Sequence, residues 1–340
     1  MTIVFSEDSL VQIFDFLSKY GMKRMEGKMI SSLKVRKLTI KEHLNIIFCR
    51  HITTIIILTI GFGVFAFFTH RNILLTAIAG FIFGVTLNYL LKSFDSTLKT
   101  PEDVEHCVRL PCLGYIPPIE KNFKNIKNID LVSHHRYYSS VAEAFRKVKT
   151  ALLATHSPEK PFKAFVVSSF IPKEGKSFVA TNLAITFAAA GEPTLLIDAD
   201  MRKGRISEIF GIGSERGLSN TLAGASSFHE GVVSTNIENL SVLPLGVASP
   251  NPIELLKVDK IKAILQEAGT KFRKIIIDTP PVLSVTDALV FGRECDGLIF
   301  VIKAGVTPFQ YIIDAKKMIG NRAKILGALL NGVDAKKSRD

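Results

Sequence analysis

With 340 residues, the chain has room for roughly two domains. Hydrophobic residues make up 47% of it and charged residues 22%, a mix that is too apolar for a disordered protein and high for a soluble one. The formal net charge is +12. Because the basic residues are not gathered in a basic and aromatic motif, we expect no nucleic-acid partner and assign the charge to cationic flanks beside a membrane.

Two long apolar segments lie in the first third of the chain. Residues 52–69 and 73–91 contain no charged side chain, and as helices each would cover about 27–29 Å, close to the thickness of a bilayer core. A short polar turn separates them, so we predict a transmembrane hairpin within residues 51–92. Lysine and arginine residues flank both outer ends, including Arg50 and Lys92, so the positive-inside rule places both ends in the cytoplasm.

The rest of the chain divides by composition. The predicted organisation is an N-terminal cytoplasmic segment 1–50, the hairpin 51–92, a juxtamembrane linker 93–135 rich in Pro, Lys and Asn, and a domain 136–340. In that domain Val141–Thr155 has a helical pattern. Three charged residues recur on one face of this helix: Glu143, Arg146 and Lys149. A solvated face and a contact surface both fit this spacing.

Apolar runs alternate with helical stretches from Phe165 onward. The predicted strands are 164–167, 194–197, 241–244, 274–277, 298–302 and 325–330. Short continuous apolar strands separated by helices indicate an α/β fold, with a mainly parallel sheet covered by helices on both faces. In such sheets ligands bind at the carboxyl ends of the strands. The four cysteines lack the spacing of a zinc site, and we expect free thiols.

A phosphate-binding loop is predicted after the first of these strands. The segment FIPKEGKS ends in Gly175-Lys176-Ser177 and leads into a helical stretch, which is the context that a P-loop requires. Backbone N–H groups and the helix N-terminus would hold the phosphates, Lys176 would reach the outer ones, and Ser177 would bind Mg²⁺. Phe170 stands where the usual pattern has its first Gly.

Carboxylates follow two further strands. Asp198 and Asp200 end the run TLLIDAD, and Asp278 ends KIIID before Thr279-Pro280-Pro281. Carboxylates beside a nucleotide bind Mg²⁺ or accept a proton. Helix capping by Asp200 is the structural alternative. Three motifs in order, each at a strand end, predict a nucleoside-triphosphate site and a P-loop NTPase fold.

A family resemblance rests on these and further motifs: LTIKEHLNIIFCR, GFIFGVTLNYLLKSFDSTLKTPEDVE, LPCLGYIPP, EAFRKVKT, GLSNTLAG, LPLGVASPNPIELL, DTPPVLSVTDALV and GALLNGVD. From about Leu33 to Asp334 the chain resembles the bacterial tyrosine kinases of capsule and exopolysaccharide export, fused to their chain-length-determinant membrane part. The resemblance implies an ATP- and Mg²⁺-dependent protein-tyrosine kinase in the bacterial inner membrane, with its kinase domain in the cytoplasm. It implies as partners the tyrosines of the chain itself or of polysaccharide-synthesis enzymes, and the polysaccharide export machinery.

The resemblance also implies roles for individual residues. Catalytic roles fall to Asp198, Asp200, Lys176 and Arg202, with Asp198 as the candidate acceptor of the tyrosine proton. The metal ligands would be Ser177, Asp200 and Asp278. The cofactor-binding residues would be Pro172, Lys173, Glu174, Gly175, Lys176, Ser177, Phe178 and Asn331. The helix face of Glu143, Arg146 and Lys149 resembles the family's ring-forming E-x-x-R-x-x-R motif, with Lys149 in place of the last Arg, which predicts a homo-oligomer of weakened contacts.

Two departures from the family are visible. Members normally carry a large extracytoplasmic domain between the spans, where this chain has three residues, and they typically end in a tyrosine cluster, where this sequence ends NGVDAKKSRD. Its tyrosines are Tyr20, Tyr89, Tyr115, Tyr137, Tyr138 and Tyr311. The adjacent pair Tyr137-Tyr138 is either an autophosphorylation site or a surface packing feature.

Two alternative functions fit parts of the sequence. A partition or cell-division ATPase shares the expected fold, but such proteins carry a further lysine at the second loop position, which is Ile171 here. A non-catalytic nucleotide-binding scaffold that organises a polysaccharide export system fits the two departures. The retained Lys176, Asp198 and Asp278 speak against it.

Overall fold

The computed structural model describes residues 80, 84, 96–119, 129–156, 162–249 and 251–334. Apart from Gly80 and Gly84, the hairpin predicted for residues 51–92 lies outside these ranges. In the part of the chain so described, no helix has both the length and the apolar character needed to cross a bilayer.

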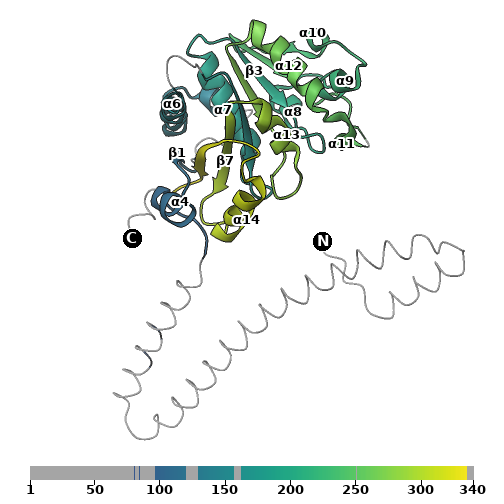
Figure 1. Ribbon diagram of the computed structural model, residues 1–340. Coiled ribbons are helices and arrows are strands. Elements are labelled where there is room, and N and C mark those ends of the chain that lie inside the picture. Colours follow the sequence, from purple (N-terminus) through teal and green to yellow (C-terminus); the bar gives the residue numbers. More distant parts are fainter. Residues whose placement is uncertain are drawn as a thin grey trace, which may run out of the picture. The chain divides into compact units, whose positions relative to one another are not determined.

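The described residues after Ser96 are built on an eight-stranded sheet with the order β1-β8-β7-β2-β6-β3-β5-β4 (Figure 1). The strands are β1 (Cys112–Ile116), β2 (Ala164–Ser169), β3 (Thr194–Asp198), β4 (Val233–Ser234), β5 (Leu240–Leu243), β6 (Lys274–Asp278), β7 (Gly297–Lys303) and β8 (Ile325–Asn331). Neighbouring strands are parallel except for β4 and β5. The predicted α/β fold with a mainly parallel sheet is confirmed.

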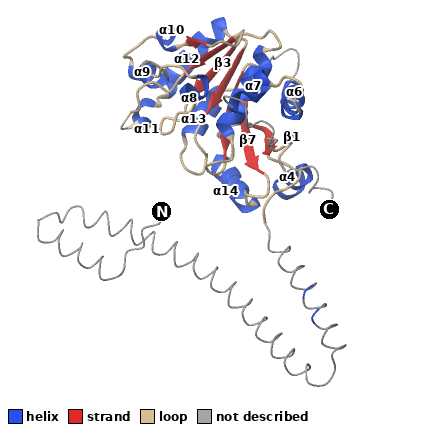
Figure 2. Ribbon diagram, turned by 180° about the vertical axis from the view of Figure 1, so that it is seen from behind, coloured by secondary structure: helices blue, strands red, loops and turns tan. Residues whose placement is uncertain are grey.

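Helices lie on both faces of this sheet, as the front and back views show (Figures 1 and 2). They are α4 (Pro101–Val108), η2 (Ile129–Leu131), α5 (Val132–His135), α6 (Ser140–Leu153), α7 (Lys176–Ala188), α8 (Ile206–Phe210), α9 (Leu218–Ala223), α10 (Phe228–Gly231), α11 (Pro252–Leu255), α12 (Val258–Lys271), α13 (Asp287–Glu294) and α14 (Phe309–Ile319). The predicted helix Val141–Thr155 corresponds to α6, and the helix predicted after the phosphate loop corresponds to α7.

The strands supply two separate hydrophobic cores because successive side chains point to opposite faces. Val166 of β2 packs into the core under α12, α13 and α14. Phe165 and Val167 pack into the core under α6 and α7. The same alternation separates Ile276 of β6 from its neighbours Ile275 and Ile277. Strands buried on both faces are apolar throughout, which is why their runs were readable in the sequence.

One assignment made from composition needs correction. The range 93–135 contains helix α4 and strand β1, rather than only a linker. Cys112–Ile116 pairs in parallel with β8, placing Tyr115 opposite Leu330 and Ile116 opposite Asn331. The helix begins with a capping box in which Thr100 and Asp103 satisfy each other's backbone N–H groups. The sheet domain therefore begins upstream of residue 136.

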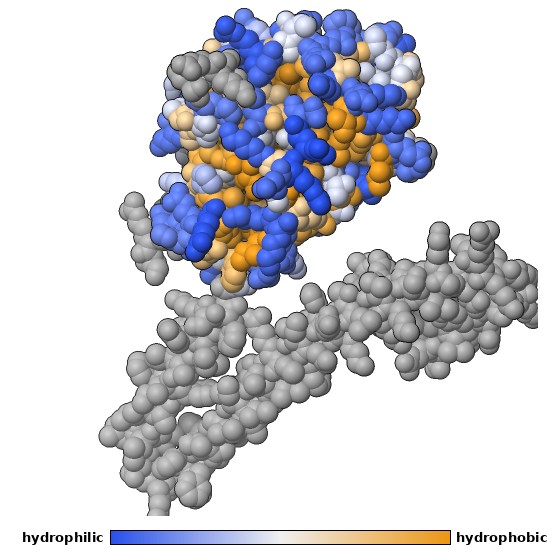
Figure 3. All heavy atoms as spheres, in the orientation of Figure 1, coloured by the Kyte–Doolittle hydropathy of each residue, from blue (hydrophilic) through white to orange (hydrophobic). Residues whose placement is uncertain are grey.

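The surface of this domain is mixed in character. On the face shown in Figure 3, hydrophilic residues lie between apolar areas. Val247, between β5 and α11, and Ile253, within α11, are among the exposed large apolar side chains. Folded proteins normally expose much apolar surface, so we attach no function to these residues.

Candidate active site

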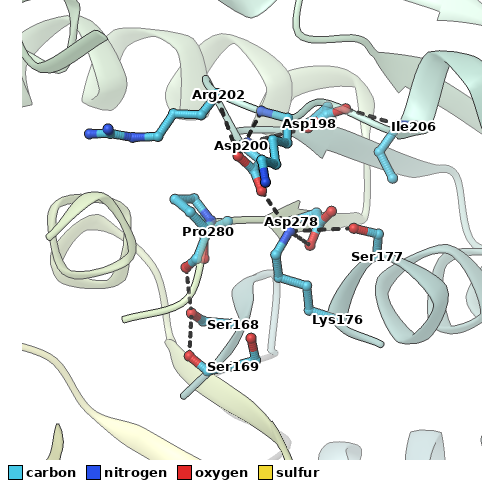
Figure 4. A network of polar contacts seen from close by, with 12 residues as sticks. Ser168, Ser169, Lys176, Ser177, Asp198, Asp200, Arg202, Ile206, Asp278 and Pro280 are labelled. Atoms are coloured by element: carbon cyan, nitrogen blue, oxygen red, sulfur yellow. Dashed lines mark hydrogen bonds and ion pairs between the residues drawn. The ribbon is translucent and has the colours of Figure 1, made fainter. Parts of the chain in front are cut away.

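Three sequence motifs meet at the carboxyl ends of neighbouring strands. In the sheet order β2-β6-β3, Val167 of β2 lies opposite Asp278 of β6, and Asp278 lies opposite Asp198 of β3. The close view in Figure 4 shows Asp200 and Asp278 beside the amine of Lys176, with Asp198 behind them and directed toward Ile206. Parallel pairing thus brings together residues that are distant in the sequence, as the strand-end rule predicts.

The phosphate loop connects β2 to α7 through two residues in the left-handed region. Lys173 has φ +71° and Gly175 has φ +93°. Val179 N donates to Gly175 O at 2.9 Å, which closes the first turn of α7, and no side chain caps this helix. The first N–H groups of α7 therefore lack partners within the helix, and a helix N-terminus of this kind is suited to bind phosphate.

Phe170 fills the core beneath the loop. Its side chain is fully buried and stacks on Phe300 of β7, with the ring centroids 4.6 Å apart. The departure from a first-position Gly is therefore explained by packing, because the ring points into the core rather than toward the cavity described below.

Glu174 holds the first half of the loop from inside. Its carboxylate is buried and accepts hydrogen bonds from Phe170 N at 2.6 Å and Ile171 N at 2.7 Å. On the other oxygen it accepts from Lys303 N at 3.3 Å and from the Thr307 hydroxyl. Burial raises the pKa of Glu174, and these hydrogen bonds oppose the rise. Glu174 is one of the predicted cofactor-binding residues, and its side chain supports the loop from inside.

Asn331, the other predicted cofactor residue outside the core motif, also supports the loop. Its Nδ2 donates to Glu174 O at 2.8 Å. A Cβ added to Gly175 would overlap that same amide nitrogen. The end of β8 therefore packs directly against the loop, and this close approach requires glycine at position 175.

Lys176 is the centre of the charged cluster. Its Nζ lies 2.8 Å from Asp200 Oδ2 and 3.7 Å from Asp278 Oδ1, and donates to Ser177 Oγ at 3.4 Å. Burial opposes the charge on this lysine, but Asp278 and Asp200 outweigh it, so the pKa of Lys176 lies above its ordinary value. The amine is therefore cationic and ready to exchange a carboxylate for a phosphate.

The carboxylate of Asp278 is buried, with the ammonium of Lys176 at 3.7 Å as its ion-pair partner. Neither of its oxygens accepts a hydrogen bond from the described residues, and burial raises its pKa. A buried carboxylate beside Ser177 and Asp200, with its oxygens free of close hydrogen bonds, could bind a divalent cation. Within the described ranges no three His, Cys, Asp or Glu residues form a metal-binding group. The two carboxylates of Asp200 and Asp278 and the Ser177 hydroxyl suit Mg²⁺, which usually takes one or two carboxylates together with phosphates and water.

Asp198 is held behind this cluster. It is fully buried, and its two oxygens accept from Asp200 N at 3.2 Å and from Ile206 N at 2.9 Å. Burial, reinforced by the nearby Asp278, raises the pKa of Asp198 to about 7. Asp200 in turn accepts from Lys203 N at 3.1 Å, so it caps the turn that follows β3 as well as binding Lys176.

A cavity of about 630 Å³ opens in front of the loop. Its lining includes eight of the predicted residues: Pro172, Lys173, Gly175, Lys176, Ser177, Phe178, Asp200 and Arg202. Glu174, Asp198, Asp278 and Asn331 are not part of the lining. Residues that were not predicted also line it: Lys203, Arg205, Pro280, Pro281, Ser284 and Val285. The basic run after Asp200 and the Pro-Pro pair after Asp278 were the signals that could have identified them.

The predicted oligomer residues lie on α6 and do not line this cavity. Arg146 is held by its own chain, because its Nη2 lies 2.6 Å from Glu143 Oε2 and its Nη1 donates to Tyr137 O at 2.8 Å. Lys149 and Arg146 border a separate hollow of about 60 Å³ beside the end of α7. The role of this face in assembly stays a prediction.

Comparison with known proteins agrees with the geometry. A family model described as an AAA domain matches residues 173–305. The chain is 37% identical over 192 residues to tyrosine-protein kinase YwqD of Bacillus subtilis (strain 168), which covers 56% of this chain and 81% of that protein. It is 34% identical over 209 residues to the putative tyrosine-protein kinase CapB of Staphylococcus aureus, covering 61% and 91%.

Solved structures that resemble this chain also include tyrosine kinase domains. The kinase domain of Escherichia coli tyrosine kinase ETK aligns with a TM-score of 0.65 and 30% identity, over 69% of this chain and 94% of that one. The chimerical protein CapA2B2 aligns with a TM-score of 0.63 and 33% identity, over 68% and 98%. The fold and loop thus define a P-loop nucleotide-binding protein. Within that class, the chain belongs to the bacterial tyrosine-protein kinase family.

Proposed function

We propose that the chain transfers the γ-phosphoryl group of ATP to tyrosine and so regulates capsule or exopolysaccharide synthesis or export. The observation that carries this proposal is the cluster of Lys176, Asp200 and Asp278 at the mouth of the phosphate loop. The relatives' names supply the tyrosine specificity. The partition-type ATPase is disfavoured, because Ile171 stands where such proteins have a second lysine.

Binding of ATP would rearrange the charged cluster. The free N–H groups at the start of α7 and the ammonium of Lys176 would hold the outer phosphates, so Lys176 would give up its contact with Asp200. Ser177, Asp200 and Asp278 would hold Mg²⁺, which when bound neutralises charge on the phosphates. Arg202, on the cavity wall, would stabilise charge that develops on the transferred group.

The tyrosine would enter along the wall of Pro280, Pro281 and Val285, whose apolar surface suits a phenol ring. We assign the acceptance of its proton to Asp198. Its pKa of about 7 suits this role near neutral pH. Because backbone N–H groups hold both of its oxygens behind the cavity lining, a bridging water or a shift of the turn at Asp200 would have to connect it to the tyrosine hydroxyl. Asp200 is less suited, because it is committed to Lys176 at 2.8 Å and then to the metal.

The test is phosphotyrosine mapping by mass spectrometry after incubation with Mg-ATP. We expect phosphotyrosine on the chain itself or on polysaccharide-synthesis enzymes, and its loss in Lys176→Ala and Asp198→Ala. Lys147→Ala, which alters an exposed residue of α6, is the control and should retain activity. ATP hydrolysis that never yields phosphotyrosine would reject the kinase assignment, and tight ATP binding without any turnover would favour the scaffold.

Attachment and assembly form part of the same proposal. Residues 52–69 and 73–91 would anchor the chain in the bacterial inner membrane with the kinase domain in the cytoplasm. The α6 face of Glu143, Arg146 and Lys149 would join copies into a homo-oligomer. Light scattering should then report smaller assemblies for Arg146→Ala than for the control Lys147→Ala, and equal masses would remove the α6 face from the proposal.

A further inference from the structure

The connection between α5 and α6 displays two tyrosines on a tight turn. Arg136 N donates to Val132 O at 2.9 Å, and Ser139 N donates to Arg136 O at 2.9 Å. Tyr137 and Tyr138 therefore occupy the two central positions of a β-turn. On the far side Ser139 caps α6 by accepting from Ala142 N at 3.1 Å. The turn is thus fixed at both ends, and its tip faces outward.

The two tyrosines are held very differently. Tyr137 is 49% exposed, and its ring lies under the Arg146 guanidinium at 4.6 Å, with its carbonyl also bound to Arg146. Tyr138 is 93% exposed, and its ring meets Tyr137 edge-on at 5.2 Å. Tyr138 can therefore leave the surface at little cost, whereas Tyr137 would first have to break its contacts with Arg146.

The other tyrosines in the described ranges are less suited to reach an active site. Tyr115 is 45% exposed in strand β1, and Tyr311 is 39% exposed in helix α14. Both belong to regular elements packed on the domain, so their backbones cannot protrude as a turn does. Tyr138 thus combines the greatest exposure with the most prominent backbone of these four residues.

The cavity requires its acceptor from outside. No tyrosine among the described residues contributes to the lining of the 630 Å³ cavity. A tyrosine that receives phosphate there therefore comes from outside this lining, and a turn of a second copy is one such source. The apolar wall of Pro280, Pro281 and Val285 offers a surface for a phenol ring, and a turn tip is the kind of segment that fits into such an opening.

We propose that Tyr138 is an acceptor site, phosphorylated in the active site of a second copy of this chain. This inference rests on the proposed kinase function. The Tyr138 hydroxyl oxygen would form a bond to the γ-phosphorus of ATP, and the bond from that phosphorus to the β–γ bridging oxygen would break. ADP would leave with the electron pair, and the phenolic proton would pass to a carboxylate of the second copy or to water. The new phosphate would lie on the same turn as the cationic Arg136, where its negative charge is favourable.

The first experiment maps the site in the full chain. Trypsin cleaves after Arg136 and Arg146, so the two tyrosines fall in one peptide, YYSSVAEAFR. After incubation with Mg-ATP, we expect fragment spectra to place phosphate on Tyr138. Tyr138→Phe should lose most of the chain's phosphotyrosine, and its matched control Tyr137→Phe should keep it. Phosphotyrosine at other positions with Tyr138 unmodified would overturn the inference.

The second experiment tests transfer between copies. A Lys176→Ala chain supplies the acceptor, and a Tyr138→Phe chain supplies the active site. Any phosphopeptide that contains Tyr138 must then come from the Lys176→Ala chain. We expect that peptide in the mixture and not in the Lys176→Ala chain alone. If wild type is phosphorylated at Tyr138 but the mixture yields no phosphopeptide containing Tyr138, transfer by a second copy would be overturned.

A random Glu-Tyr copolymer separates this inference from the function on which it rests. We expect the Tyr138→Phe chain to phosphorylate the copolymer as wild type does, because the change is at an exposed residue outside the cavity. Copolymer labelling without modification of Tyr138 would refute the acceptor site alone. Failure of wild type to label either substrate would refute the kinase function, and the acceptor site with it.

Discussion

Replacement of Glu174 by Gln tests whether a buried carboxylate holds the phosphate loop. The carboxylate accepts four hydrogen bonds: from Phe170 N and Ile171 N on one oxygen, and from Lys303 N and the Thr307 hydroxyl on the other. Glutamine is nearly isosteric but has only one acceptor oxygen. The substitution therefore changes hydrogen bonding and charge while leaving the packing almost unchanged.

The loss of stability in Glu174→Gln is estimated for the orientation of the glutamine amide that keeps the most hydrogen bonds. Its oxygen would keep Phe170 N and Ile171 N, and its NH₂ group would face Thr307, whose hydroxyl can reverse and accept. The two retained bonds lose their charge assistance, together about 2 kcal/mol, and Lys303 N is left unpaired at about 1–3 kcal/mol. Burial of the carboxylate raises the pKa of Glu174, which means that burying its charge is unfavourable. The uncharged glutamine avoids this penalty, so part of the lost stability is regained. We expect a net loss of about 2 kcal/mol in the free energy of unfolding.

The assay combines urea unfolding with binding of a fluorescent ATP analogue. If the loop must recover its shape on binding, about 2 kcal/mol corresponds to a roughly 30-fold weaker affinity. Glu208→Gln, at an exposed position of α8, controls for the loss of one charge, and Thr307→Ser keeps the hydroxyl donor. Ordinary surface substitutions change the free energy of unfolding by about 0.5 kcal/mol or less. If Glu174→Gln stays within that range and binds the ATP analogue with unchanged affinity, the supporting role of Glu174 is refuted.

Three further predictions follow from the same geometry. Gly175→Ala should destabilise the chain and abolish nucleotide binding, because the new Cβ overlaps the amide of Asn331. The control Gly191→Ala, at φ +79° and with open space around the new Cβ, should lose only about 1–2 kcal/mol of stability through left-handed backbone strain. Equal losses of unfolding free energy in urea would contradict this prediction. Burial raises the pKa of Asp198 to about 7, so above its unfolded pKa the folded state keeps a proton that the unfolded state releases. The free energy of unfolding should therefore fall as pH rises toward about 7, and Asp198→Asn should reduce that fall in urea titrations at about pH 5 and about pH 8. Burial raises the pKa of the half-buried Cys295 thiol, whereas Cys107 is exposed. Peptide mapping should therefore find maleimide on Cys107 well before Cys295, and the reverse order would contradict this difference in exposure.

The strands that carry the site could be predicted because their signal is local. Thr194–Asp198 and Lys274–Asp278 are buried on both faces, so the middle of each is an uninterrupted apolar run that a carboxylate follows. The parallel arrangement then follows from the helices between them, and with it the meeting of Asp198 and Asp278. No knowledge of distant contacts was needed for this part of the site.

Strand β1 could not be predicted in the same way. Its sequence CLGYI is short and stands between prolines, and its partner β8 lies at the other end of the domain sequence. Gly114 has φ +142° and interrupts the register between Cys112 and Gly114. A strand defined by a distant partner and an irregular register leaves almost no periodic signal.

The orientation of individual loop side chains was also beyond the sequence. Glu174 lies between residues expected to contact phosphate, and nothing in the motif indicates that it turns inward. Its direction is set by Thr307 and Lys303, which β7 brings to the loop. Asn331 has the same explanation, because its amide reaches Glu174 O only after β8 is placed beside β7.

The loop that carries Thr307 also receives the beginning of the domain. Leu98 N donates to Thr307 O at 3.2 Å, and Gly305 N donates to Leu98 O at 2.8 Å. Thr307 donates through its hydroxyl to Glu174, which in turn binds the N–H groups of the phosphate loop. The segment at Leu98 and the phosphate loop therefore share a single support. Because Thr307 bonds to one side through its backbone and to the other through its side chain, loss of its hydroxyl would leave the pairing with Leu98 intact while releasing Glu174.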